Sequence, residues 1–235
     1  MKGFPSECID ITVTSPPYDN LRTYNGYEFR FDETAQELYR VTKQGGVVVW
    51  VVNDATIKGS ETLTSFKQAI YLNKIGFNVH DTMIYLKNGF AFPESNRYPN
   101  VFEYMFVLSK GSPKVFNGIK DRPNKHKGKA LTGTDRQKDG SLKPISGLGK
   151  VLTDFGVRFN VWQINNQKKN NFHPAPFPEQ LAEDHILTWS NPGDIVLDPM
   201  CGSGTTCKMA VKNGRQYIGI DISEEYCEIS KRRVV

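Results

Sequence analysis

Two short segments carry residues whose types and spacing are suited to chemistry, and the first is residues 14–18, Thr-Ser-Pro-Pro-Tyr. The Ser15 hydroxyl and the Pro16 carbonyl can each accept a hydrogen bond, so together they can hold the two N–H groups of one amine. Pro16 and Pro17 fix their own φ angles, which positions both acceptors in advance. Tyr18 offers an aromatic face on which a flat ring can stack. Taken alone, the tetrapeptide Ser-Pro-Pro-Tyr at residues 15–18 is better explained as an ordinary proline-rich turn.

The second segment is residues 198–206, Asp-Pro-Met-Cys-Gly-Ser-Gly-Thr-Thr, between a predicted strand and a predicted helix. Gly202 and Gly204 let the backbone turn tightly and approach a ligand closely. About twenty residues further on, a second strand ends in Asp221, where an acidic residue can accept hydrogen bonds from ribose hydroxyls. This spacing fits a nucleoside-containing cofactor, and the alternative is a plain strand-to-helix connection. A dinucleotide fingerprint is disfavoured because Cys207 stands where its third glycine belongs.

Residues 198–206 resemble the S-adenosylmethionine loop of the DNA amino-methyltransferases, which typically reads Asp-Pro-Phe-x-Gly-Ser-Gly-Thr-Thr, with Met200 replacing the phenylalanine. Residues 173–181 resemble the segment that precedes this loop in the family, and residues 38–46 and 97–104 also look like family segments. The resemblance therefore covers most of the chain. It implies S-adenosylmethionine as cofactor, bound by Pro178, Asp198, Pro199, Met200, Cys201, Gly202, Ser203, Gly204, Thr205 and Asp221.

The same resemblance makes Ser15, Pro16, Pro17 and Tyr18 the catalytic segment, which holds the exocyclic amine of a base flipped out of DNA. Serine at the first position resembles the cytosine-N4 enzymes, whereas the adenine-N6 relatives more often carry aspartate or asparagine, so adenine N6 stays as the alternative. Methylation of RNA or protein is a third, weaker possibility. Carbon-5 methylation of cytosine is a poor fit, because it needs a nucleophilic cysteine, usually after proline, and no cysteine of this chain follows a proline.

Positive charge gathers between the two segments. The net charge is only +5, yet residues 110–150 hold eleven Lys or Arg against three Asp. The order of amine-holding segment, basic stretch and cofactor loop resembles the beta class of the family, which carries its target-recognition region at this place. We expect one methyltransferase domain over residues 1–235, with a target-recognition insertion at 110–160; a solvated loop is the alternative. The predicted DNA contacts are Lys120, Arg122, Lys125, Lys127, Lys129 and Arg136.

The predicted strands and helices place both segments at one edge of a sheet. Residues 9–13 alternate as a strand does and deliver residues 14–18 to its carboxyl end, where open α/β sheets bind ligands. The run 47–52 predicts a central strand buried on both faces. The whole pattern predicts an α/β fold with a doubly wound, mostly parallel, Rossmann-like sheet. Two helices show an apolar stripe that we expect to be buried, namely Ala35, Leu38 and Val41 in one and Leu63, Phe66 and Ile70 in the other.

The amino-terminal end departs from the family pattern. Family members usually have a strand and a helix before the amine-holding strand, and here only seven residues precede Cys8. We therefore expect a shortened member with weakened cofactor binding, and a catalytically silent DNA-binding remnant is the competing hypothesis.

Composition and cysteine spacing indicate the cellular location and whether to expect metal sites or disulfides. No apolar run approaches the length of a membrane span, and the first residues do not form a signal-peptide core. The four cysteines lack CxxC spacing, so we predict neither a metal site nor disulfides. We expect a cytoplasmic protein of a prokaryotic or phage-infected cell, with double-stranded DNA as partner and a homodimer as a candidate assembly.

Overall fold

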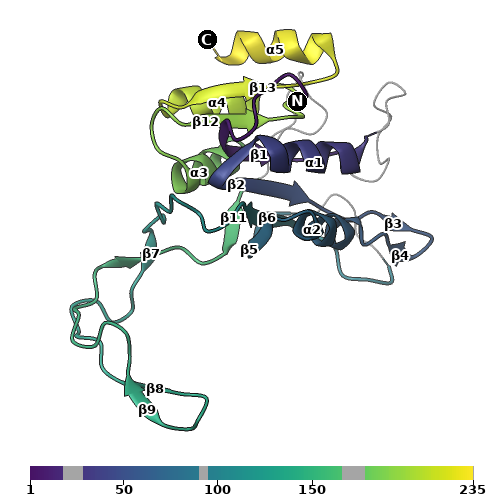
Figure 1. Ribbon diagram of the computed structural model, residues 1–235. Helices are drawn as coiled ribbons and strands as arrows, with labels where there is room; N and C mark the ends of the chain where they lie inside the picture. Colours follow the sequence, from purple (N-terminus) through teal and green to yellow (C-terminus); the bar gives the residue numbers. More distant parts are fainter. Residues whose placement is uncertain (18–28, 90–94, 166–177, 235) are drawn as a thin grey trace. The chain divides into compact units, whose positions relative to one another are not determined.

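The computed structural model describes residues 1–17, 29–89, 95–165 and 178–234. It divides into two compact units (Figure 1). Unit 1 comprises residues Met1–Asn117 and Asn160–Val235, and unit 2 comprises Gly118–Phe159.

One seven-stranded sheet forms the centre of unit 1. Its strands are β1 (Ile9–Thr14), β2 (Thr42–Val52), β5 (Asn78–Lys87), β6 (Phe102–Ser109), β11 (Val161–Ile164), β12 (Ile195–Asp198) and β13 (Gln216–Gly219). The spatial order is β11-β5-β6-β2-β1-β12-β13. β6 runs antiparallel to both of its neighbours, and every other pair is parallel. The predicted doubly wound, mostly parallel α/β sheet is confirmed.

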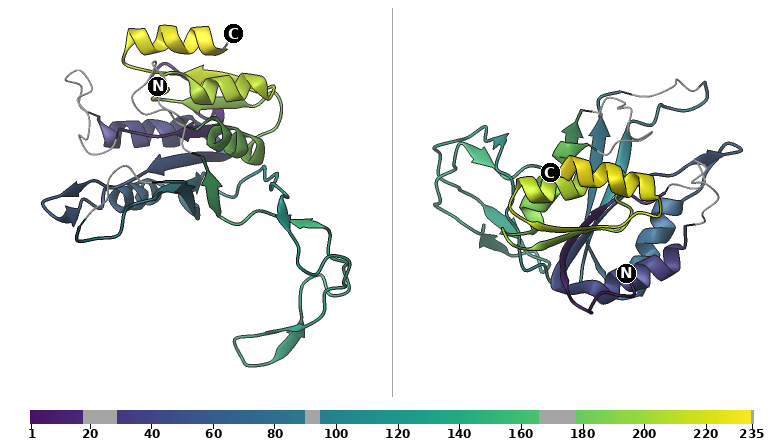
Figure 2. Two further views of the ribbon diagram at one scale, coloured as in Figure 1. Left: turned by 180° about the vertical axis from the view of Figure 1, so that it is seen from behind. Right: turned by 90° about the horizontal axis from the view of Figure 1, so that it is seen from above.

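The described part of the chain contains five helices. They are α1 (Phe31–Val41), α2 (Thr64–Lys74), α3 (Glu179–Trp189), α4 (Thr205–Lys212) and α5 (Glu224–Val234). Seen together, Figures 1 and 2 place α1 and α2 against one face of the sheet and α3 and α4 against the other. Both faces of the central strands are therefore covered, as an apolar run such as Val47–Val52 requires. In the described part of the chain, no helix has the length and apolar character needed to cross a bilayer.

The buried stripe predicted for α1 is confirmed, because Ala35, Leu38 and Val41 are all fully buried. The stripe predicted for α2 is wrong. Phe66 is 42% exposed and Ile70 is 70% exposed. The helix instead turns Ser65, Gln68, Ala69 and Leu72 inward. Trp50 of β2 explains the choice, since its buried indole N–H donates a hydrogen bond of 2.9 Å to the Gln68 side chain. Satisfying that donor outweighs burying the more apolar face.

Unit 2 consists of short paired strands and turns. β7 (Arg122–Pro123) pairs with β10 (Phe155–Gly156), and β8 (Thr134–Arg136) pairs with β9 (Leu142–Pro144), both antiparallel. None of the residues 118–159 is buried, so backbone hydrogen bonds rather than an apolar core hold the unit together. A segment with so little apolar burial offsets only part of its ordering entropy by itself.

Candidate functional site

The two segments singled out in the sequence meet at one edge of the sheet. β1 and β12 are parallel neighbours, with Ile11 opposite Val196, so their carboxyl ends lie side by side. A buried hydrogen bond of 2.8 Å from the Thr14 hydroxyl to the Asp198 carboxylate joins these ends. A second bond of 3.2 Å runs from the Thr206 hydroxyl to the Val13 carbonyl. Ser15, Pro16 and Pro17 therefore follow directly beside the loop that begins at Asp198, whereas Tyr18 lies outside the described residues.

Asp198 is a buried carboxylate without a cationic partner among the described residues. Burial raises the pKa of Asp198 to about 6, and the nearby negative charge of Asp221 adds to this rise. Hydrogen bonds from the Thr14 hydroxyl and the Met200 N–H act in the opposite direction. An unpaired carboxylate in this position is costly for the fold, and such costs are concentrated at functional sites.

Two glycines shape the loop between β12 and α4. Gly202 and Gly204 have φ angles of 48° and 79°, in the left-handed region that favours glycine. A Cβ atom on Gly204 would also lie 2.7 Å from the Cβ atom of Ser230 on α5, so a side chain at this position has no room. Pro199, Met200, Cys201, Ser203 and Thr205 make up the rest of this loop and the first turn of α4.

Asp221 lies just after β13, and it contacts the same loop. Its carboxylate accepts hydrogen bonds of 2.8 Å from the Gly202 N–H and 2.9 Å from the Ser223 N–H. The position predicted for a ribose acceptor therefore lies directly beside the glycine turn. Each carboxylate oxygen has two lone pairs, so these bonds leave acceptor capacity for a ligand.

An arginine that sequence reasoning missed also holds the loop. The Arg233 guanidinium on α5 donates to the Ser203 carbonyl at 2.7 Å and to the Ser203 hydroxyl at 2.6 Å. Arg233 also forms an ion pair of 3.2 Å with Glu179, the first residue of α3. Glu179 forms a second ion pair, of 2.7 Å, with Lys208. Pro178, which precedes α3, is buried. The only sequence signal for Arg233 was a basic residue in the last turn of a helix, which is a general helix preference and not a site pattern.

The predicted DNA contacts all lie in unit 2, and most of them face solvent. Exposed side chains belong to Lys120, Lys125, Lys127, Lys129 and Arg136. Arg122 differs, because its guanidinium donates to the Val157 carbonyl at 3.0 Å and lies 4.7 Å from the centre of the Phe159 ring. Arg122 therefore stabilises unit 2 from within.

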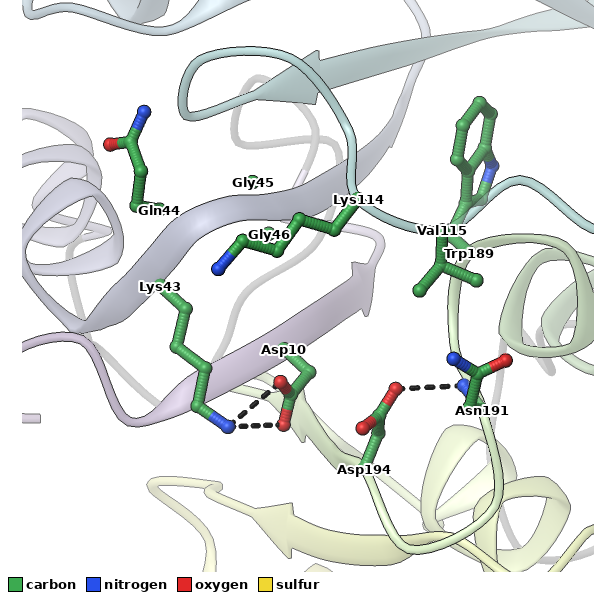
Figure 3. A pocket seen from close by; sticks show the side chains of 10 residues that line it. All are labelled: Asp10, Lys43, Gln44, Gly45, Gly46, Lys114, Val115, Trp189, Asn191 and Asp194. Carbon is green, nitrogen blue, oxygen red and sulfur yellow. Dashed lines mark hydrogen bonds and ion pairs between the residues drawn. The ribbon is translucent and has the colours of Figure 1, made fainter.

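A separate cavity of about 300 Å³ lies at the amino-terminal ends of β1 and β12, the opposite edge of the sheet (Figure 3). Asp10 accepts two hydrogen bonds of 2.7 Å from Lys43 there, and one of 2.9 Å from the Ile195 N–H. These contacts join the starts of the two strands whose ends meet at Thr14 and Asp198. None of the predicted site residues lines this cavity.

Comparison with known proteins agrees with the geometry. Residues 9–232 match the N6/N4 methyltransferase family, described as DNA methylase. The orphan methyltransferase M.BamHII of Bacillus amyloliquefaciens is 58% identical over 244 residues, which cover 100% of this chain and 92% of that protein. The DNA adenine methyltransferase YhdJ of Escherichia coli (strain K12) is 27% identical over 248 residues, covering 100% of this chain and 79% of the relative.

A solved structure shares the fold. The PvuII DNA methyltransferase, titled cytosine-N4-specific, matches with a TM-score of 0.72 at 22% sequence identity. The match covers 100% of this chain and 82% of the PvuII enzyme chain.

Proposed function

The chain belongs to the N6/N4 DNA methylase family, and on that premise we propose that it methylates the exocyclic N4 of cytosine in double-stranded DNA. It is an S-adenosylmethionine-dependent DNA methyltransferase, as its family is. The observation that supports the proposed site is the Thr14–Asp198 hydrogen bond, because it sets Ser15 beside the predicted cofactor loop. The choice of cytosine over adenine is based on the residue type at position 15.

The residues of this loop suit the cofactor. S-adenosylmethionine bears a sulfonium and an ammonium cation and supplies the methyl group when bound. Asp198, a buried carboxylate with no cationic partner in the described chain, complements such a positive charge. The glycine turn at Gly202 and Gly204 allows close backbone approach, and Asp221 beside it accepts hydrogen bonds from hydroxyl groups.

The segment after β1 prepares the amine. The lone pair of an exocyclic amine is delocalised into the base ring, which makes the nitrogen a poor nucleophile. When the Ser15 hydroxyl and the Pro16 carbonyl accept its two N–H bonds, the nitrogen becomes more tetrahedral and its lone pair turns towards the cofactor loop. Pro17 keeps the segment rigid, and Tyr18 is proposed to stack on the flipped base. The nitrogen releases a proton after, or as, the methyl group arrives.

Cytosine is favoured because Ser15 occupies the position where adenine-N6 enzymes more often carry aspartate or asparagine. The names of the similar proteins divide between the two bases, since YhdJ is named for adenine and the PvuII enzyme for cytosine N4. Adenine N6 is therefore the second candidate.

Unit 2 is the proposed target-recognition region. Its exposed lysines and Arg136 are suited to neutralise DNA phosphates, and DNA would supply the ordering contacts that a unit without a core lacks.

Chemical identification of the methylated base tests this function. The protein is incubated with isotope-labelled S-adenosylmethionine and mixed-sequence duplex DNA at several salt concentrations, and the DNA is digested to nucleosides for mass spectrometry. We expect labelled N4-methylcytosine. Labelled N6-methyladenine would support the second candidate, and absence of label at every salt concentration would favour a silent DNA-binding protein.

A further inference from the structure

A small hairpin stands at the same edge of the sheet as Ser15. β2 is parallel to β1, with Thr14 opposite Trp50, so the carboxyl ends of both strands lie together. The chain leaves β2 at Val52 and forms a hairpin from β3 (Thr56–Ile57) and β4 (Ser60–Glu61). All views in Figures 1 and 2 show this hairpin projecting away from the sheet beyond the end of β2.

The tip of the hairpin is narrow, apolar and positively charged. Ile57 pairs with Ser60, and Lys58 and Gly59 between them have φ angles of 50° and 80°, as a two-residue turn with both centres left-handed requires. Ile57 is 54% exposed. An isoleucine on a projecting turn gains little burial within the protein itself. Glu61 lies one pair further from the tip.

Hydrogen bonds from outside the hairpin hold it in place. The Arg97 guanidinium donates to the Thr56 hydroxyl at 3.0 Å and to the Gly59 carbonyl at 2.8 Å. At the base, Asp54 accepts hydrogen bonds of 2.9 Å and 2.6 Å from the backbone and the hydroxyl of Ser65 on α2. A tip fixed in this way loses little conformational entropy when it enters a partner.

We propose that Ile57 and Lys58 form a wedge that enters the DNA duplex beside the flipped base. Ile57 would fill the space that the base leaves in the stack, and Lys58 would contact a neighbouring phosphate. This proposal rests on the proposed function, because only a duplex substrate has a stack to fill. Apolar side chains inserted between base steps offset part of the unstacking cost, which is a few kcal/mol per step.

Duplex DNA fits this tip better than a protein partner for two reasons. The flipped base must come to Ser15, so the duplex must lie along the edge from which the hairpin projects. An apolar residue next to a cation also matches a base stack flanked by phosphates.

The test compares two duplexes after the methylated site has been mapped with wild-type protein on plasmid DNA. One duplex carries the target base correctly paired, and the other carries it mispaired and so already partly unstacked. We expect Ile57→Ala to lower the single-turnover rate of methyl transfer about tenfold on the paired duplex and less than twofold on the mispaired one. Lys58→Asn, which suits the left-handed turn, should weaken DNA binding and lower its salt dependence.

Val211→Ala is the matched control, since Val211 is an exposed aliphatic residue on α4. It should leave both rates unchanged. Equal losses on the two duplexes with Ile57→Ala, or no loss on the paired one, would overturn the wedge. If wild-type protein methylates no site on plasmid DNA, the proposed function fails before either duplex can be designed, and the wedge fails with it.

Discussion

Thr14 and Asp198 are 184 positions apart in the sequence and share a buried hydrogen bond of 2.8 Å. The bond joins the ends of two central parallel strands, and each strand continues directly into one half of the proposed site. Its donor and acceptor therefore couple the segment proposed to hold the amine to the loop proposed to hold the cofactor.

Removal of this bond should destabilise the protein and weaken cofactor binding together. Thr14→Val keeps the shape but leaves the buried Asp198 carboxylate with one donor fewer, at a cost of about 1–3 kcal/mol in the free energy of unfolding. Thr14→Ser, which retains the hydroxyl, is the control and should lose less. Urea denaturation measures the stability, and calorimetric titration measures the S-adenosylmethionine affinity. Equal stability of Thr14→Val and wild type would show that the bond contributes nothing.

The raised pKa of Asp198 predicts a specific pH dependence. The carboxyl takes up a proton more readily in the folded protein, with a pKa of about 6, than in the unfolded chain, whose ordinary value is 3.8. The folded state therefore binds more protons between these values, and stability from this group falls as the pH rises from about 4 to about 6. With 1.36 kcal/mol per pKa unit, the loss is about 3 kcal/mol.

Asp198→Asn removes this titration. Its stability relative to wild type, measured by urea denaturation without cofactor, should improve between pH 4 and pH 7. If the difference in free energy of unfolding between the variant and wild type stays constant, or shifts in favour of wild type as the pH rises, the ionised Asp198 carboxylate does not destabilise the fold. The variant should also bind S-adenosylmethionine more weakly than wild type, because a neutral amide does not complement a cation.

Arg233 is predicted to be a positioning residue for the cofactor loop. Arg233→Gln removes its bonds to Ser203 and Glu179, so the loop should spend less time in its binding conformation. We expect the KM for S-adenosylmethionine to rise about tenfold while kcat changes less than twofold. Arg232→Gln, at the exposed neighbouring position, should behave as wild type. A fall in kcat without a change in KM would show that Arg233 acts in some other way.

Lys125, Lys127 and Lys129 should contribute to DNA binding through phosphates. Their joint replacement by glutamine is expected to lower the slope of log affinity against log salt concentration by about three, since each phosphate contact contributes about 0.9. Fluorescence anisotropy with a mixed-sequence duplex at several salt concentrations measures this slope. An unchanged slope would exclude these lysines from the DNA contact.

Residue patterns predicted the fold well where local rules and tertiary packing agree. The helix with Ala35, Leu38 and Val41 and the strand ending at Asp198 both follow simple periodicity or position. Residue patterns gave the wrong buried face for α2. There, the hydrogen bond between the Trp50 indole and Gln68 determines which face points inward, and the more apolar face stays exposed. Sequence spacing also placed Asp221 near the cofactor loop, and its bond to Gly202 is consistent with that.

The role of Arg233 could not be predicted in the same way. Its partners Ser203 and Glu179 lie 30 and 54 positions away, and nothing in a helix pattern specifies contacts across elements. Such contacts depend on how α5 packs against the loop, which the missing side chain at Gly204 permits.

In the proposed site, Ser15 prepares the amine while the neighbouring loop at Asp198 holds the cofactor. The most direct measurement is the single-turnover rate of methyl transfer by Ser15→Ala on duplex DNA at saturating S-adenosylmethionine. We predict that Ser15→Ala transfers the methyl group about 100-fold more slowly than wild type, because the amine is no longer positioned. The affinity of the variant for S-adenosylmethionine should be unchanged. Transfer at the wild-type rate would contradict this role of Ser15.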